Sequence, residues 1–258
     1  MIAWRAAAAL AAVTMSAAPA TAAPDWSAKW GRYHLSMNDR DIVVTYGIKL
    51  LFSAKAWARA DHAQAVRDAD GDAVRTEHRF SMVALAGPYL SLKDESYTDI
   101  TPSAHPGGET RLWTIDLRRL RGPGKIAPEQ AVDLATLVGA TPLSRALVAD
   151  PVVRTSGVRP GASLDAIRTA LPQANFGKGD ACFDVPEDWT SRFAIRGWQG
   201  AQLQVRLGLP GLGSCRYNLT QLGLAVAVSP TLRKTIGPIQ AAPPSRAVKI
   251  TFDTPPRR

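Results

Sequence analysis

The chain has 258 residues, of which 46% are hydrophobic and 21% charged, a composition that is ordinary for a folded protein and excludes wholesale disorder. Its 31 Lys and Arg residues outnumber its 22 Asp and Glu residues, which gives a formal net charge of +9. A charge of this sign concerns surfaces and partners and says nothing about the fold. Because no segment carries a strong catalytic motif, function has to be inferred from compartment, charge and resemblance.

The first 22 residues have the features of a secretory signal peptide. Arg5 supplies a positive charge, residues 6–13 are apolar, and Ala20 and Ala22 place small side chains where a signal peptidase cleaves. The alternative, a buried helix, is disfavoured because the apolar run has no polar face, and the run is too short to span a bilayer. We therefore predict cleavage after Ala22, a periplasmic or secreted protein over residues 23–258, and no transmembrane segment after cleavage.

Alternation of apolar and polar residues predicts strands in the first half of the chain, at 41–52 (one strand or a bent hairpin), 79–86, 87–92 and 110–117. Between the first two, residues 68–72 carry carboxylates at alternate positions, as at the start of a calcium loop. The glycine is misplaced, and Arg79 stands where a bidentate Glu is needed, so these residues favour a solvated acidic turn.

Helices are expected in the middle of the chain and strands again towards its end. Helical spacing covers 128–139 and 142–149, and a third helix begins after the N-cap Ser163 and ends at Pro172. Four further strands are predicted, at 192–196, 201–207, 222–228 and 247–252. This order predicts an α+β fold, an antiparallel sheet with a few short helices packed on one face. We expect one domain or two closely packed subdomains, about 23–153 and 154–258.

Two cysteines, Cys182 and Cys215, fit an oxidising compartment as a disulfide, with two free thiols as the alternative. Neither lies in a C-x-x-C pair or near a histidine, and the histidines show no metal-ligand spacing. The sequence therefore predicts no metal site and no cofactor.

Residues from about 80 to 150 resemble the C-terminal domain shared by the lysozyme-responsive anti-sigma factor RsiV and the peptidoglycan deacetylase PdaC. The likeness is carried by the strand block at 80–91, by Ala104-His105-Pro106 followed by the strand at 113–117, and by the helical residues 143–150. Where that family continues into a Thr-Gly-Lys turn, residues 118–125 of this chain are longer and more basic. The resemblance implies an exported, non-catalytic domain that works at the cell envelope.

Two features are candidate ligand-binding sites. His105 lies in a loop between two predicted strands, where it can be presented to a ligand; the alternative is a turn histidine bonded to nearby backbone. The densest basic cluster consists of Arg118, Arg119, Arg121 and Lys125. An exported cluster of this kind would attract an anionic envelope polymer or a protein ligand and not nucleic acid, and its alternative is a solvated turn.

These observations favour an exported, non-catalytic cell-envelope protein that binds an envelope or protein ligand. The competing hypothesis is a periplasmic hydrolase acting on cell-wall material, for which Ser103, His105 and Asp116 are the conceivable triad.

Overall fold

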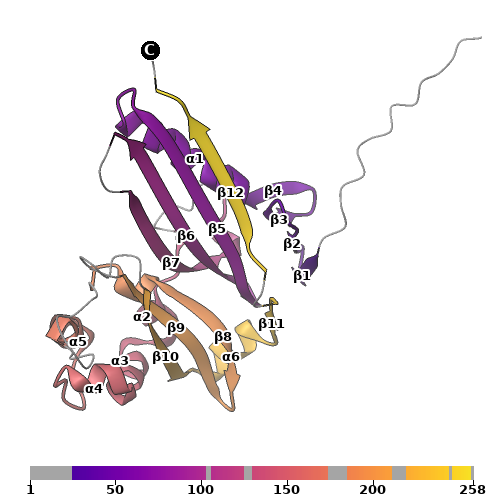
Figure 1. The fold of residues 1–258 in the computed structure, drawn as a ribbon. Helices are drawn as coiled ribbons and strands as arrows, with labels where there is room; N and C mark the ends of the chain where they lie inside the picture. Colours follow the sequence, from indigo (N-terminus) through magenta and orange to yellow (C-terminus); the bar gives the residue numbers. More distant parts are fainter. Residues whose placement is uncertain are drawn as a thin grey trace, which may run out of the picture.

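The fold contains three antiparallel sheets and a set of short helices, as seen in a computed structural model (Figure 1). The structure describes residues 25–102, 106–124, 130–173, 185–210, 219–243 and 246–256. The predicted α+β class is confirmed. The predicted signal peptide lies outside the described residues.

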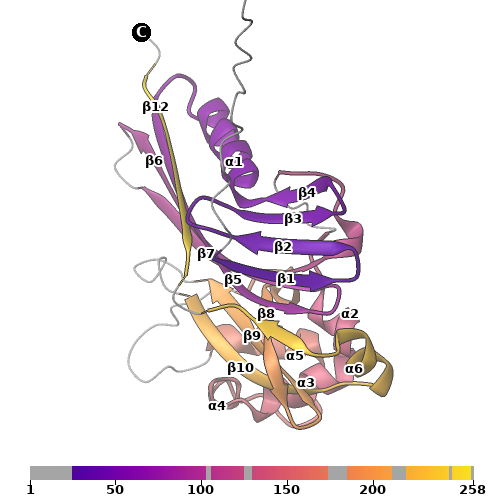
Figure 2. The same ribbon diagram turned by 90° about the vertical axis from the view of Figure 1, so that its right-hand side faces the viewer.

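The first sheet is a four-stranded meander followed by a helix (Figure 2). Its elements are β1 (Trp26–Trp30), β2 (Tyr33–Met37), β3 (Ile42–Tyr46), β4 (Lys49–Ser53) and α1 (Ala54–Asp68). The segment 41–52 therefore forms a hairpin, which is one of the two structures predicted for it. The helix α1 was not predicted, because its sequence is polar and rich in alanine. It begins at Ser53, whose side chain accepts a hydrogen bond from the Ala56 N–H at 3.0 Å.

The second sheet is built on the long hairpin of β5 (Ala73–Ala86) and β6 (Tyr89–Thr101). The strand β7 (Gly107–Asp116) pairs with β6, while β11 (Ile239–Ala241) and β12 (Val248–Thr254) pair with opposite ends of β5. We call this the central sheet. Since the residues of a strand point alternately to its two sides, the hairpin has one inward face, towards α1, and one outward face.

The turn that joins β5 to β6 requires glycine at position 87. Gly87 has a φ of +58°, and a Cβ there would lie 2.3 Å from the carbonyl oxygen of Thr235. This close approach fixes the end of the hairpin against α6 (Pro230–Ile236).

The inward face forms the first hydrophobic core. Phe80, Met82 and Leu92 of the central sheet pack with Phe52 of the meander and Trp57 of α1. The ring centroids of Trp57 and Phe80 lie 5.5 Å apart. The core therefore joins the meander and α1 to one side of the central sheet.

A third sheet carries most of the helices. Its strands are β8 (Phe193–Gln199), β9 (Gln202–Pro210) and β10 (Leu219–Ala227), with β9 in the middle. The helices α2 (Leu134–Val138), α3 (Ala140–Ala149), α4 (Pro151–Thr155) and α5 (Leu164–Ala170) contribute to a second core on one face of this sheet. Figure 1 shows these helices grouped below the central sheet.

The helix predicted over 128–139 is shorter than expected. Ala131 forms a bridge with Ile115, and the Val132 N–H donates to the carbonyl of Thr114 at 2.8 Å, so the backbone here pairs with β7 in place of starting a helix. The helix α2 begins only after Asp133, whose side chain accepts from the Thr136 N–H. The helices predicted at 142–149 and after Ser163 are confirmed.

Two buried hydroxyls dock β8 on the outward face of the central sheet. Thr114 donates to the carbonyl of Phe193 at 2.8 Å, and the Ile195 N–H donates to Ser91 Oγ at 2.9 Å. The two hydroxyls are hydrogen-bonded to each other at 2.9 Å. They satisfy backbone groups of β8 that would otherwise be buried without partners.

None of the helices in the described ranges is long and apolar enough to cross a membrane.

Candidate functional site

The predicted basic cluster begins at the end of β7, where Asp116 holds the chain in a turn. The carboxylate of Asp116 caps the 3₁₀ turn Leu117–Arg119 and accepts two hydrogen bonds from the guanidinium of Arg118, at 2.8 and 2.6 Å. These bonds raise the pKa of Arg118. Arg119 lies 3.8 Å from the same carboxylate. We call Arg118, Arg119 and Arg121 the arginine turn.

The arginine turn has a structural role in addition to its charge. Asp116 is buried, so its negative charge has to be compensated, and the paired geometry of Arg118 does this. Arg118 also lies over the ring of Tyr89, 5.8 Å from its centroid. Its charge is therefore largely engaged within the protein, while Arg121 is exposed and donates to the Arg118 carbonyl at 3.4 Å.

The other predicted site residues are not among those that the structure describes; they are His105, Lys125, Cys182 and Cys215. The binding role of His105 and the disulfide both stay predictions.

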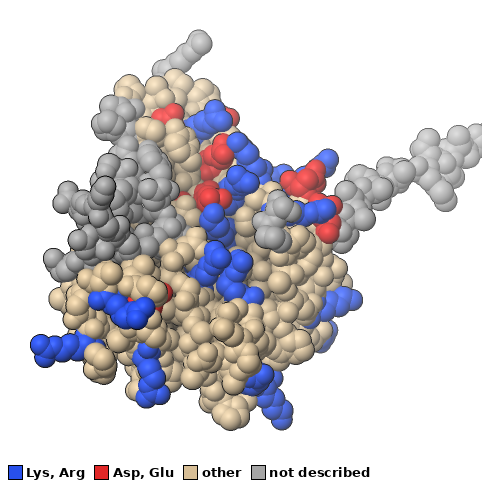
Figure 3. All heavy atoms as spheres, turned by 60° about the horizontal axis from the view of Figure 1, so that its bottom comes forward, with Lys and Arg blue, Asp and Glu red and all other residues tan. Residues whose placement is uncertain are grey.

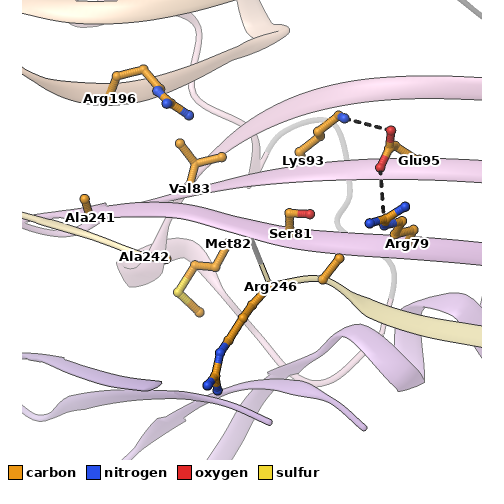
Figure 4. Close-up of a pocket in the computed structure, with 11 residues that line it drawn as sticks. Arg79, Ser81, Met82, Val83, Lys93, Glu95, Arg196, Ala241, Ala242 and Arg246 are labelled. Atoms are coloured by element: carbon orange, nitrogen blue, oxygen red, sulfur yellow. Dashed lines mark hydrogen bonds and ion pairs between the residues drawn. The ribbon is translucent and has the colours of Figure 1, made fainter. Parts of the chain in front are cut away.

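A groove on the outward face of the central sheet was not predicted. It has a volume of about 470 Å³ and lies where β5 and β6 meet β8 and the segment between β11 and β12 (Figure 4). Its charged lining consists of four cationic residues and a single carboxylate: Arg79, Lys93, Arg196, Arg246 and Glu95. We call it the cationic groove.

The charges of this groove are only partly compensated. Lys93 Nζ lies 2.7 Å from Glu95, and Arg79 lies 3.9 Å from the same carboxylate, so two cations share one anion. Arg246 turns away from Lys93 and pairs with Asp25 at 2.8 Å. Arg196 points into the groove from β8 and forms no ion pair within the part of the chain that the structure describes.

Arg196 also borders a second, smaller hollow of about 320 Å³ on the outer face of the third sheet. This hollow is lined by Arg206 of β9 together with Gln199 and Gln204. Burial and the positive charge of Arg206 both lower the pKa of Arg196. Burial is the larger cause, and the contribution of Arg206 reflects a like charge nearby, which favours an anion between the two arginines.

The cationic character of this region can be followed in Figure 3. Lys and Arg side chains run along the middle of the face shown, and the Asp and Glu side chains of this run lie in its upper part. The arrangement can bind an anion through several cationic side chains from different strands.

A charged cluster built on the buried side chains of His78 and Asp94 lies on the opposite, inward face of the hairpin. The imidazole of His78 is 3.1 Å from Asp94 of β6 and 3.4 Å from Asp61 of α1, and it stacks on Phe80. Burial lowers the pKa of His78, but the hydrogen bonds and charges of the two carboxylates outweigh burial and raise this pKa to about 9. His78 is therefore a protonated residue that ties α1 to the central sheet.

Within the described ranges, no three His, Cys, Asp or Glu side chains form a group that could hold a metal ion. Comparison of the chain with protein-family models, with curated proteins and with solved structures found no match in any of the three. The resemblance to the RsiV and PdaC domain stays a prediction.

The sequence can reveal a site whose residues are close together in the chain, but not one whose residues come from distant segments. Asp116 and Arg118 are two positions apart, and an Asp before a turn is a signal that could have been read as a cap. Arg196 gave no such signal, because its neighbours Arg79 and Lys93 come from strands more than 100 positions earlier in the chain.

Proposed function

We propose that the chain is an exported, non-catalytic protein that binds an anionic ligand of the cell envelope, and that the cationic groove is its main binding site. The observation that carries this proposal is the composition of the groove, whose lining contains four cationic residues and one carboxylate. Export rests on the signal-peptide pattern of residues 1–22.

The shape of the groove supports an extended ligand. Its cations come from β5, β6, β8 and the segment before β12, and Arg196 connects it to the second hollow on the third sheet. A small ion would need donors that converge on one point, whereas these are spread along a surface. A chain with repeated negative charges can contact several of them at once.

The surroundings of Asp116 support binding over hydrolysis. The hydrolase hypothesis uses Asp116 to orient His105, but both carboxylate oxygens of Asp116 accept hydrogen bonds from the Arg118 side chain. A carboxylate engaged in this way is a poor partner for a catalytic imidazole.

The test is a titration of the exported form, beginning at Ala23, with fluorescently labelled inorganic polyphosphate. We expect Arg196→Gln to raise the Kd about fivefold, because one uncompensated charge on a surface is worth about 1 kcal/mol. The matched control is Arg154→Gln, an exposed arginine of α4 that does not line the groove, for which we expect no change. Equal effects of the two substitutions would overturn the groove as the site.

A second measurement addresses catalysis. The same protein is incubated with purified peptidoglycan, and both the pelleted protein and the released soluble fragments are measured. Pelleting that polyphosphate competes away, without fragment release, is the expected result. Release of fragments would overturn the non-catalytic proposal and favour the hydrolase.

A further inference from the structure

The turn between β3 and β4 exposes an unusual set of apolar side chains. Four large hydrophobic residues are exposed within the described ranges, and three of them, Tyr46, Ile48 and Leu50, lie in this turn. The side chain of Ile48 is fully exposed, and those of Tyr46 and Leu50 are exposed by 38% and 39%. Since such turns usually carry Gly, Asn or Asp, an isoleucine at this position is not explained by the turn itself.

Cationic side chains surround this apolar tip. Lys49 is exposed between Ile48 and Leu50, and the guanidinium of Arg32 lies over the ring of Tyr46 at 4.8 Å from its centroid. The ring of Tyr46 meets the ring of Tyr33 edge-on, with centroids 4.9 Å apart. The tip therefore has an apolar centre and a basic rim.

Tyr33 connects this tip to the arginine turn. Its pKa is raised by burial, by Tyr46 and by Asp116, while the positive charges of Arg118 and Arg121 act in the opposite direction. Leu117 and Leu120, beside these arginines, belong to the same hydrophobic core as strands β2 and β3, so the turn after β7 packs against the meander. Figure 2 shows the four strands of the meander side by side, with the β3–β4 turn at their right-hand end.

We propose that the β3–β4 turn, together with the arginine turn, docks on the surface of an anionic phospholipid bilayer. A bilayer suits this shape because the tip is a turn with outward-pointing side chains, and a lipid layer can receive such side chains without a complementary pocket. The basic rim faces the lipid phosphates while the apolar side chains enter the region of the acyl chains. The contribution of the arginine turn comes mainly from the exposed Arg121, since Asp116 engages Arg118 and Arg119.

The test is co-sedimentation of the exported form with vesicles of phosphatidylcholine containing phosphatidylglycerol, and with vesicles of phosphatidylcholine alone. We expect binding to the anionic vesicles and weaker binding to the neutral ones. Ile48→Ser combined with Leu50→Ser should lower partitioning to anionic vesicles at least about tenfold, because two apolar side chains no longer enter the bilayer. Lys49→Gln should lower it about fivefold.

Matched controls come from elsewhere on the molecule. Tyr97→Ser removes the fourth exposed hydrophobic side chain, which lies on β6, and Lys234→Gln removes an exposed charge of α6. Neither substitution should change partitioning. Because all of these residues are exposed, none of the variants is expected to lose its fold, and circular dichroism checks this.

Three results would overturn the inference. The first is equal binding to neutral and anionic vesicles, or none to either. The second is loss of vesicle binding in Arg196→Gln but not in the Ile48 and Leu50 variant, which would place lipid headgroups in the cationic groove. The third is a dimer of the chain in solution that Ile48→Ser dissociates, which would assign the tip to a second copy of the protein.

Discussion

The two faces of the β5–β6 hairpin carry charge in contrasting ways. On the inward face His78 lies between the carboxylates of Asp61 and Asp94, and both His78 and Asp94 are buried. On the outward face the neighbouring Arg79 shares one carboxylate, Glu95, with Lys93. A buried cation needs compensation within the protein, whereas an exposed one can be left for a ligand.

The contrast also separates structural from binding roles among the arginines. Arg118 is matched to a buried carboxylate two residues away, while Arg196 has a like charge, Arg206, as its electrostatic neighbour. The cations are densest in the sequence at residues 118–125, but Arg196 is less compensated in the fold than Arg118.

The largest expected effect tests the inward face. Replacing the buried cation by His78→Leu removes the cation that faces the buried carboxylate of Asp94 and should lower the free energy of unfolding by about 3–5 kcal/mol. The matched change on the outward face, Arg79→Leu, should cost no more than about 0.5 kcal/mol. Urea denaturation at neutral pH measures both. Similar losses for the two variants would contradict the comparison.

The second prediction concerns pH. Folding raises the pKa of His78 from 6.5 to about 9, so the folded state favours the protonated imidazole. The stability that this provides is complete below pH 6.5 and is lost as pH rises through 9. Since one pKa unit corresponds to about 1.4 kcal/mol, the loss should reach about 3 kcal/mol. It is measured by urea denaturation across this range, and His78→Leu should remove it; an unchanged pH profile in that variant would assign the loss to other groups.

The smallest expected effect sharpens the description of the outward face. Glu95→Gln removes the single carboxylate of the cationic groove and frees Arg79 and Lys93 for a ligand. Affinity for polyphosphate should rise about threefold, since the interaction concerns partly exposed charges. Asp165→Asn, on the exposed surface of α5, is the control and should have no effect. Weaker binding by Glu95→Gln would show that Glu95 positions the cations instead of competing with the ligand.

The strands of this fold were largely predictable because most have one buried and one exposed side. Alternation in residues 79–86 and 201–207 follows directly from that environment; the first segment lies within β5, and all but the first residue of the second lies within β9. The helix α1 was missed because it buries few side chains, among them Ala54, Trp57 and Ala58, so its sequence shows no clear apolar stripe. Its N-cap Ser53 was the available signal.

The binding surfaces were less predictable, because they are assembled from residues that lie far apart in the sequence. Arg196 was assigned to a strand, yet its place in the cationic groove depends on how the third sheet docks on the central sheet through Ser91 and Thr114. The partners of His78 include Asp61 on the helix that was missed. Contacts of this kind depend on tertiary packing, which single-sequence periodicity does not encode.

The pairing of β12 with β5 has a consequence for the order in which the protein can fold. Val248 and Ile250 belong to the same core as Ala28 and Leu35, and β12 pairs with residues of β5 that were synthesised some 170 positions earlier, since Val248 lies opposite Phe80. The N-terminal core therefore stays open along one side until the residues of β12 have emerged. Contacts across such a distance close slowly, and until then the edge of β5 offers unpaired backbone groups to any other strand. A truncation before β12 would make that exposure permanent, so the last strand protects the nascent protein from aggregation as well as completing its sheet.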